Sequence, residues 1–300
     1  MKRFFGHAFQ SVSGQSVSGQ SIVGLSMAGL AAVLASAGTA LADQPKPWQM
    51  GFQEAATPTM ERVTDFNMLL LWIITAITLF VLALMIYVVV KFNEKANPTP
   101  SKTTHNTLIE VIWTAVPILI LVVIAVPSFK LLYFADSNPE TEMTLKITGH
   151  QWYWSYEYPD NGGFAFDSYI VDAADLEPGQ PRLLTVDNKV VLPVNTKIKL
   201  LMTSEDVFHN WAVPAFGIKL DTVPGRLNET WIEITKPGNY YGQCSELCGV
   251  NHGFMPIHVE AVSKEDFAAW VESAKEEFAN NDSAPAAGAA TLLVADNSAE

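Results

Sequence analysis

Residues 66–90 read FNMLLLWIITAITLFVLALMIYVVV, 25 positions without a charged side chain. A second run, VIWTAVPILILVVIAVPSF, covers residues 111–129 and is free of charge over 19 positions. A helix of about 20 apolar residues crosses the hydrocarbon core of a membrane, which is roughly 30 Å thick. Buried core helices are the alternative, but they rarely run this far without a polar face. We therefore predict two membrane-spanning helices, at about residues 66–90 and 111–130.

The segment between the two runs predicts how this hairpin is oriented. Lys91, Lys95 and Lys102 outnumber Glu94 there, and short loops rich in Lys and Arg stay on the cytoplasmic side. We therefore expect a two-pass protein in which the parts before and after the hairpin lie on the outer side of the membrane.

The first residues support the same orientation. A positively charged start is followed by a run of apolar and small residues that ends in Ala40-Leu41-Ala42, as in a secretory signal peptide. We expect residues 1–42 to be that signal, and residues 43–135 to hold an N-terminal segment and both helices. A bacterial inner membrane with both outer parts in the periplasm agrees with these features.

Beyond Asp136 the hydrophobic pattern changes from long apolar runs to short alternating ones. Four segments alternate and are rich in β-branched residues: Met143–Gly149, Arg182–Val186, Lys197–Met202 and Thr230–Thr235. Short strands separated by Pro and Gly turns are typical of a β-sandwich or barrel, which we expect over residues 136–262. Ser263 and Asp266 predict a capping box for a helix over 263–278. Residues 279–300 have the composition of a disordered tail.

Charge is unevenly distributed along the chain. The whole sequence has a formal charge of −13, yet residues 136–300 alone carry 10 Lys and Arg against 25 Asp and Glu, a net of −15. An acidic domain facing water attracts basic partners and speeds their encounter, although it also serves solubility. We expect no nucleic-acid partner.

The only two cysteines lie in the stretch YGQCSELCGVNHGFMP, residues 241–256. Cys244, Cys248, His252 and Met255 have the spacing C-x3-C-x3-H-x2-M, and two thiolates with an imidazole and a thioether are typical copper ligands. A one-copper blue site needs a single Cys, so the second thiol indicates a second ion. His209, 35 residues before Cys244, is the candidate for a further imidazole.

A disulfide between the two cysteines is the structural alternative, and an oxidising compartment would favour it. Such a small loop has little entropic effect on stability, and a disulfide does not explain the accompanying His and Met. Among the other histidines, His258 is expected to be structural. His7 falls in the signal, while His105 and His150 have no ligand cluster around them.

These residues resemble a known family. GHQWYWSYEY at 149–158, His209-Asn-Trp211 and CSELC at 244–248 are similar to subunit II of haem-copper cytochrome c oxidases, and the resemblance runs from about residue 48 to 278. It implies a membrane-anchored all-β protein, in which a two-helix hairpin precedes a cupredoxin-like Greek-key β-barrel with a short C-terminal helix. It also implies a binuclear copper A centre, with ligands at His209, Cys244, Glu246 through its carbonyl, Cys248, His252 and Met255.

The resemblance implies further roles and partners. The Glu246 side chain would reach a magnesium ion shared with subunit I, Trp152 would receive electrons from cytochrome c, and Glu110 would take part in proton uptake. The docking surface would include the acids Glu157, Asp167, Asp187 and Asp206. The expected partners are cytochrome c, the haem-bearing subunit I, further oxidase subunits and membrane lipid, and oxygen would be reduced in subunit I.

Three other kinds of protein share part of this pattern. Quinol-oxidase subunits or assembly proteins of similar fold lack the thiol pair. Nitrous oxide reductase shares the copper motif without a two-helix anchor before it. A copper chaperone would need exposed Met or His pairs in place of an enclosed loop.

Overall fold

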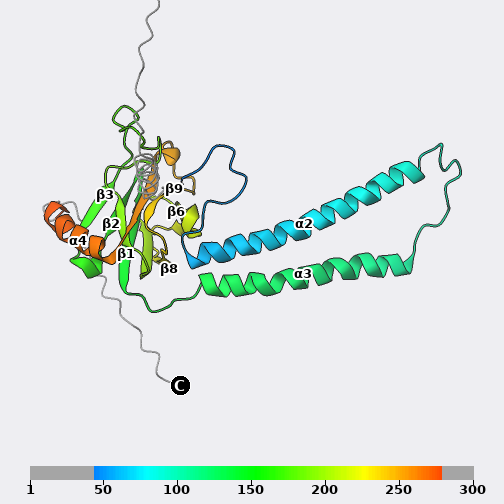
Figure 1. Cartoon of the computed structure of the whole chain (residues 1–300), viewed down its shortest axis with the longest axis horizontal. Coiled ribbons are helices and arrows are strands. Elements are labelled where there is room, and N and C mark those ends of the chain that lie inside the picture. The colour runs from blue at the N-terminus through cyan, green and yellow to red at the C-terminus, as the bar shows by residue number, and fades with distance from the viewer. Residues whose placement is uncertain (1–43, 279–300) are drawn as a thin grey trace, which may run out of the picture. The chain divides into compact units, whose positions relative to one another are not determined.

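The computed structural model describes residues 44–278 (Figure 1). The signal peptide expected at 1–42 and the tail expected at 279–300 therefore lie outside the described residues.

Two long helices follow the N-terminal segment: α2, Pro58–Lys91, and α3, Thr107–Ala135. They run side by side in opposite directions (Figure 1). Both extend beyond the charge-free runs, and each begins directly after a capping residue. The Thr57 side chain accepts from the backbone N–H of Met60 at the start of α2, and the Asn106 side chain accepts from that of Ile109 at the start of α3.

The apolar faces of both helices are exposed. Each contains a window long and apolar enough to cross a membrane, and none of either window is buried within the described part of the chain. This exposure argues against the alternative of buried core helices, because such helices would be covered by the rest of the fold.

Within residues 44–278, ten strands form two five-stranded sheets. The first has the order β3-β2-β1-β5-β8 and the second β4-β10-β9-β6-β7. Strands β1 and β5 pair in parallel, as do β4 and β10, and the remaining neighbours are antiparallel. The strands are β1 Met143–His150, β2 Tyr153–Glu157, β3 Ala165–Ser168, β4 Val190–Pro193, β5 Lys197–Ser204, β6 His209–Val213, β7 Ile218–Thr222, β8 Asn228–Glu233, β9 Gly238–Cys244 and β10 Pro256–Val262. Three short 3-10 helices are η1 Pro159–Asn161, η2 Pro214–Phe216 and η3 His252–Phe254.

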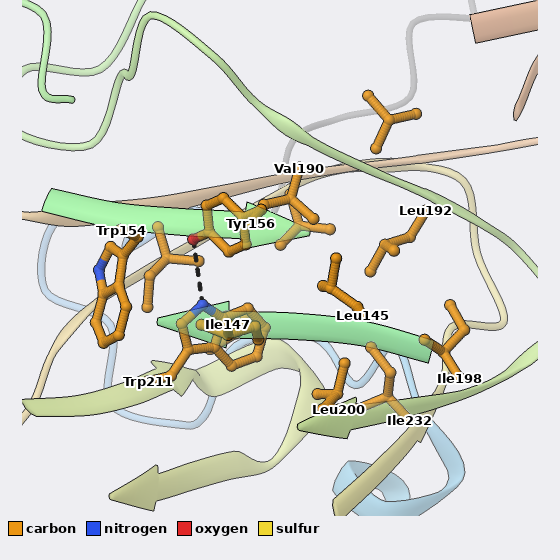
Figure 2. Close-up of a cluster of buried hydrophobic side chains, with 14 of the residues drawn as sticks. Leu145, Ile147, Trp154, Tyr156, Val190, Leu192, Ile198, Leu200, Trp211 and Ile232 are labelled. Carbon is orange, nitrogen blue, oxygen red and sulfur yellow. Dashed lines mark hydrogen bonds between the residues drawn. The ribbon is translucent and has the colours of Figure 1, made fainter. Parts of the chain in front are cut away.

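The core lies between the two sheets (Figure 2). It is built from alternate residues of each strand, because successive side chains of a strand point to opposite faces. Trp154 and Tyr156 of β2 are fully buried in it with Trp211 of β6, whose Nε1 donates to the Tyr156 hydroxyl at 3.3 Å. This buried hydrogen bond joins the two sheets next to the cysteine loop, since Trp211 pairs with Cys244.

The expected strand at Arg182–Val186 was wrong. These residues form a turn, in which Leu183 has a φ of +67° and the N–H of Leu184 donates to the carbonyl of Pro181. Only Val186 makes an isolated bridge, with Ile170. A positive φ is incompatible with an extended ladder, so this short β-branched pattern was overridden by the turn after Pro181.

Helix α4, Lys264–Phe278, closes the described chain. Phe267, Val271 and Ala274 are buried against the core, and Trp270 packs beside them. The Ser263 hydroxyl accepts from the N–H of Asp266 and donates to the Asp266 carboxylate. The predicted cap at this position therefore forms, with a side-chain bond in place of the return bond to the backbone.

The N-terminal segment is tied to the β domain just before α2. The N–H of Ala56 donates to the carbonyl of Ala215, and the N–H of Thr235 donates to the carbonyl of Ala56. Thr57 is buried and donates its hydroxyl to the carbonyl of Phe216 at 2.7 Å. The N-terminal end of α2 is thus fixed to the β domain, at η2 and just after the end of β8.

Candidate metal centre

Two neighbouring strands and one loop bring the candidate ligands together. His209 is the first residue of β6, and Cys244 is the last residue of the adjacent β9. The loop between β9 and β10 then carries Cys248, His252 and Met255 back toward them. The N–H of Ser245 donates to the carbonyl of Asn210 at 3.1 Å, which holds the start of the loop on β6.

The sulfur atoms lie at the centre of this arrangement. Cys244 Sγ and Cys248 Sγ are 3.9 Å apart, and the Met255 Sδ is 3.5 Å from Cys248 Sγ. A disulfide requires about 2.05 Å, so the thiols are free and the disulfide alternative does not apply to this structure. With metal–sulfur bonds of about 2.3 Å, one ion can contact two sulfurs at this separation.

Each thiol also faces one imidazole. His209 Nδ1 is 3.9 Å from Cys244 Sγ, and His252 Nδ1 is 3.6 Å from Cys248 Sγ. The ligand atoms of His209, Cys244 and Cys248 all lie within 4.8 Å of one another, in a buried group able to hold a metal ion. The carbonyl of Glu246 is 3.4 Å from Cys244 Sγ, and its side chain is exposed. A donor set of two thiols, two imidazoles and a thioether fits soft or borderline ions such as copper.

A carboxylate orients the His209 ring. His209 Nε2 lies 2.8 Å from Asp206 Oδ1, on the edge opposite Nδ1. Such a partner on the outer nitrogen fixes the ring orientation of a metal-binding histidine. Asp206 was expected only as a docking acid, and its contact with His209 was missed. The one signal in the sequence is that Asp206 stands three residues before His209.

The surroundings shift the pKa values of Cys244 and Cys248 in opposite directions. Burial by itself raises the pKa of Cys244, but hydrogen bonds with His209 and the Asn210 backbone outweigh it and lower that pKa to about 7. Burial, followed by the neighbouring Cys244 thiolate, raises the pKa of Cys248 well above its ordinary value. Cys244 is therefore the thiol that loses its proton first.

Two tryptophans border the thiol pair. Trp154 is fully buried, donates Nε1 to the carbonyl of Met255 at 3.3 Å and lies edge-on to the His209 ring at 5.9 Å. Trp152 is half-buried and donates Nε1 to the carbonyl of Cys248 at 3.2 Å. Only Trp152 was expected at the site from the sequence. Trp154 belongs to the core and also forms a wall of the site.

The expected docking acids all accept bonds from their own domain. Glu157 pairs with Lys146 at 2.8 Å, Asp167 accepts from the Ser155 hydroxyl, and Asp187 accepts from the N–H of Tyr169. None of them is buried, and Asp187 and Asp206 are exposed. These carboxylates therefore stay at the surface, and the bonds within the domain fix the orientation of their side chains.

Glu110 and His258 lie away from the thiols. Glu110 is in the first turn of α3, where its Oε1 accepts from the N–H of Asn106 at 3.3 Å. His258 is buried in β10, shares a hydrogen bond with Asn239 and packs on Tyr241. His150 contacts Ser155 and Tyr153. The described structure brings none of these three residues into the thiol cluster.

The fold and this loop define a membrane-anchored protein with a cupredoxin-like β domain and a soft-metal site. Residues 143–262 match the family described as cytochrome C oxidase subunit II, periplasmic domain, and residues 45–131 match its transmembrane domain. The chain belongs to the cytochrome c oxidase subunit II family. It is thus a two-pass membrane protein and part of an oxidoreductase complex, and the family implies copper.

Individual relatives agree with this assignment. A probable cytochrome c oxidase subunit 2 of Rickettsia bellii is 54% identical over 241 residues, covering 80% of this chain and 90% of that protein. Cytochrome c oxidase subunit 2 of Zea mays is 50% identical, covering 78% of this chain and 92% of that protein. Among solved structures, the periplasmic domain of subunit II of the cytochrome oxidase of Bradyrhizobium japonicum is 55% identical. It covers 47% of this chain and 98% of that one, with a TM-score of 0.44.

Proposed function

We propose that this chain receives electrons from a cytochrome c at a binuclear copper A centre and passes them to the haems of subunit I, where oxygen is reduced to water coupled to proton translocation. The observation that carries the proposal is the pair of free thiols 3.9 Å apart, each facing its own imidazole. These donors would hold a binuclear copper centre that accepts and passes on single electrons. A disulfide would need neither histidine, and a structural zinc site would have no use for Met255.

The proposed copper ligands are His209, Cys244, the carbonyl of Glu246, Cys248, His252 and Met255. The chain's own contribution is to hold these donors before an ion arrives, because strands β6 and β9 fix His209 and Cys244 as neighbours. Trp154 and Met255 exclude water from the sulfurs, since both are buried. A rigid, dry site favours electron transfer because little has to reorganise when the charge changes.

The test of this proposal is metal content and electron paramagnetic resonance. We expect the chain, loaded with copper under reducing conditions and then oxidised, to hold two coppers that share one delocalised spin. No copper, or a single isolated ion, would leave a structural subunit of the oxidase and reject electron transfer through this chain.

We propose that the Glu246 side chain holds a magnesium ion at the contact with subunit I. The exposed carboxylate and the carbonyl near Cys244 belong to the same residue, so one side-chain change separates the two roles. In Glu246→Ala the carbonyl is retained. We expect the purified complex to lose magnesium and keep both coppers; unchanged magnesium would exclude the role.

We propose that cytochrome c docks on the acidic surface around Trp152, with Glu157, Asp167, Asp187 and Asp206 contributing charge. The domain's net charge of −15 supports a basic partner. For Glu157→Gln and Asp187→Asn we expect a higher KM for cytochrome c and a weaker dependence of KM on salt. Lys146→Met, which frees the Glu157 carboxylate, should lower KM. If the KM for cytochrome c is the same as wild type in all three variants, this surface is not the docking site.

We propose that Glu110 takes part in proton uptake at the cytoplasmic side. It lies on the first turn of a membrane helix, where ionisable groups are often functional. Glu110→Gln keeps an oxygen that accepts from Asn106 and removes only the charge. Unchanged turnover and proton uptake in this variant would exclude the role.

We propose that the chain lies in a bacterial inner membrane with its β domain in the periplasm. The lysines of the inter-helix segment and the Rickettsia relatives support this location.

A further inference from the structure

Two neighbouring side chains donate hydrogen bonds to the same backbone oxygen. Gln151 Nε2 lies 2.7 Å from the carbonyl oxygen of Cys248, and Trp152 Nε1 lies 3.2 Å from it. This carbonyl belongs to a residue whose thiol is in the metal site. The shorter of the two bonds comes from Gln151, a surface residue to which no role has been assigned.

The backbone of Gln151 is bound to the other ligand-bearing segment. Its N–H donates to Asp206 Oδ2 at 2.7 Å, while Asp206 Oδ1 lies 2.8 Å from His209 Nε2. Gln151 therefore contacts the His209 segment through its backbone and the cysteine loop through its side chain. Trp152 follows directly and contacts the cysteine loop through its indole.

The cysteine loop is shaped for this close approach. Gly249 has a φ of +124°, and a Cβ at this position would lie 3.0 Å from both Gln151 Nε2 and Trp152 Cζ2. Any larger residue would push the amide and the indole away from the Cys248 carbonyl. The absence of a side chain at Gly249 thus lets both groups rest on the loop.

We propose that Gln151 is a positioning residue for electron transfer, which fixes the Trp152 indole against the carbonyl of Cys248. This inference rests on the proposed function. The Trp152 side chain and the Cys248 backbone would carry one electron from the haem of cytochrome c, whose iron goes from ferrous to ferric, to a copper centre that the site would hold. Gln151 itself is neither oxidised nor reduced; it keeps the Trp152 indole and the Cys248 carbonyl in contact when the partner docks.

The test compares two glutamines whose side chains donate to carbonyls of the same loop, the one between β9 and β10. Gln151→Met removes the side-chain donor and keeps the backbone bond to Asp206. The control is Gln243→Met, because Gln243 Nε2 donates to the carbonyl of Gly253 at 3.0 Å but does not touch Trp152. Both variants are purified as the complete oxidase complex, and copper content and the electron paramagnetic resonance spectrum are recorded first.

We expect both complexes to keep two coppers. In Gln151→Met the electron transfer rate from saturating cytochrome c should fall by about tenfold or more, because small misplacements of a reacting group are costly. The KM for cytochrome c should be unchanged, and a small inorganic reductant that reaches the copper directly should reduce both variants at the wild-type rate. Gln243→Met should match the wild type throughout.

Two results would overturn the inference while leaving the proposed function intact. One is a copper-replete Gln151→Met complex that accepts electrons from cytochrome c at the wild-type rate. The other is loss of copper in this variant, which would make Gln151 a structural support of the metal loop. A wild-type complex without copper would instead refute the proposed function, and this inference with it.

Discussion

His209 Nε2 and Asp206 Oδ1 lie 2.8 Å apart, on the ring edge opposite the nitrogen that faces Cys244. The side chain of His209 is fully buried, whereas that of Asp206 is 32% exposed. Asp206 thus connects a buried candidate ligand to the surface on which we propose that cytochrome c docks. One carboxylate is placed to serve both the metal site and the partner.

For Asp206→Asn we expect copper affinity to fall by about 10- to 100-fold, because an oriented carboxylate raises the basicity of the imidazole that it holds. Competition with a copper chelator measures this without cytochrome c. Asp187→Asn is the control, since Asp187 is exposed and bonds only to its own loop and Tyr169. Equal affinities in the two variants would assign Asp206 to docking alone.

The two thiols should ionise in separate steps in the metal-free protein. The pKa of Cys244 is lowered to about 7 and that of Cys248 is raised, so thiolate absorbance in the ultraviolet should rise by one equivalent as pH passes about 7. The second equivalent should appear only in strongly alkaline solution. Cys244→Ser should abolish the first step. A single step of two equivalents near the ordinary thiol pKa would contradict the separation.

His258 should make the β domain sensitive to acid. Burial, and then the charge of Lys189, lowers its pKa to about 4 from an ordinary value of 6.5. Between these two pH values His258 is protonated in the unfolded chain but not in the folded one. The free energy of unfolding therefore falls as pH drops from about 6.5 to 4. The loss is at most about 3 kcal/mol.

The measurement is the melting temperature of wild type and His258→Gln at neutral pH and near pH 4.5. Gln keeps a donor for Asn239 but does not titrate. The melting temperature of the variant should therefore fall less on acidification than that of the wild type. His105→Gln is the matched control, because His105 is exposed between the helices. A fall in the His258→Gln variant equal to that of wild type would assign the acid sensitivity to other groups.

Thr57 should be needed to join the first membrane helix to the β domain. Its hydroxyl accepts from the N–H of Met60 and donates to the carbonyl of Phe216. Thr57→Val keeps the shape and leaves both backbone groups unpaired in a buried place. We expect a loss of about 1–2 kcal/mol in the free energy of unfolding, with Thr57→Ser close to wild type. Thermal unfolding in detergent measures it, and equal values for Val and Ser would show that neither bond contributes.

Most of the architecture could be predicted from local patterns. The charge-free runs at 66–90 and 111–129 lie within α2 and α3, because a membrane helix is determined by its own composition. Three of the four predicted strands formed close to their expected positions. Arg182–Val186 did not, because the turn after Pro181 and the positive φ of Leu183 are backbone features that a short β-branched run does not reveal.

The sequence by itself determined the type of site, since the spacing of Cys244, Cys248, His252 and Met255 restricts which chemistry their loop can perform. Only the tertiary structure decided which distant residues join that loop. His209, which the sequence had already suggested as a ligand, is joined there by Asp206, Gln151 and Trp154. They reach the loop from β2, β6 and the turns beside them, through pairing between strands that are far apart in the chain. Strand pairing depends on how whole faces pack, so no local pattern predicts that Asp206 binds His209 or that Gln151 lies on Cys248.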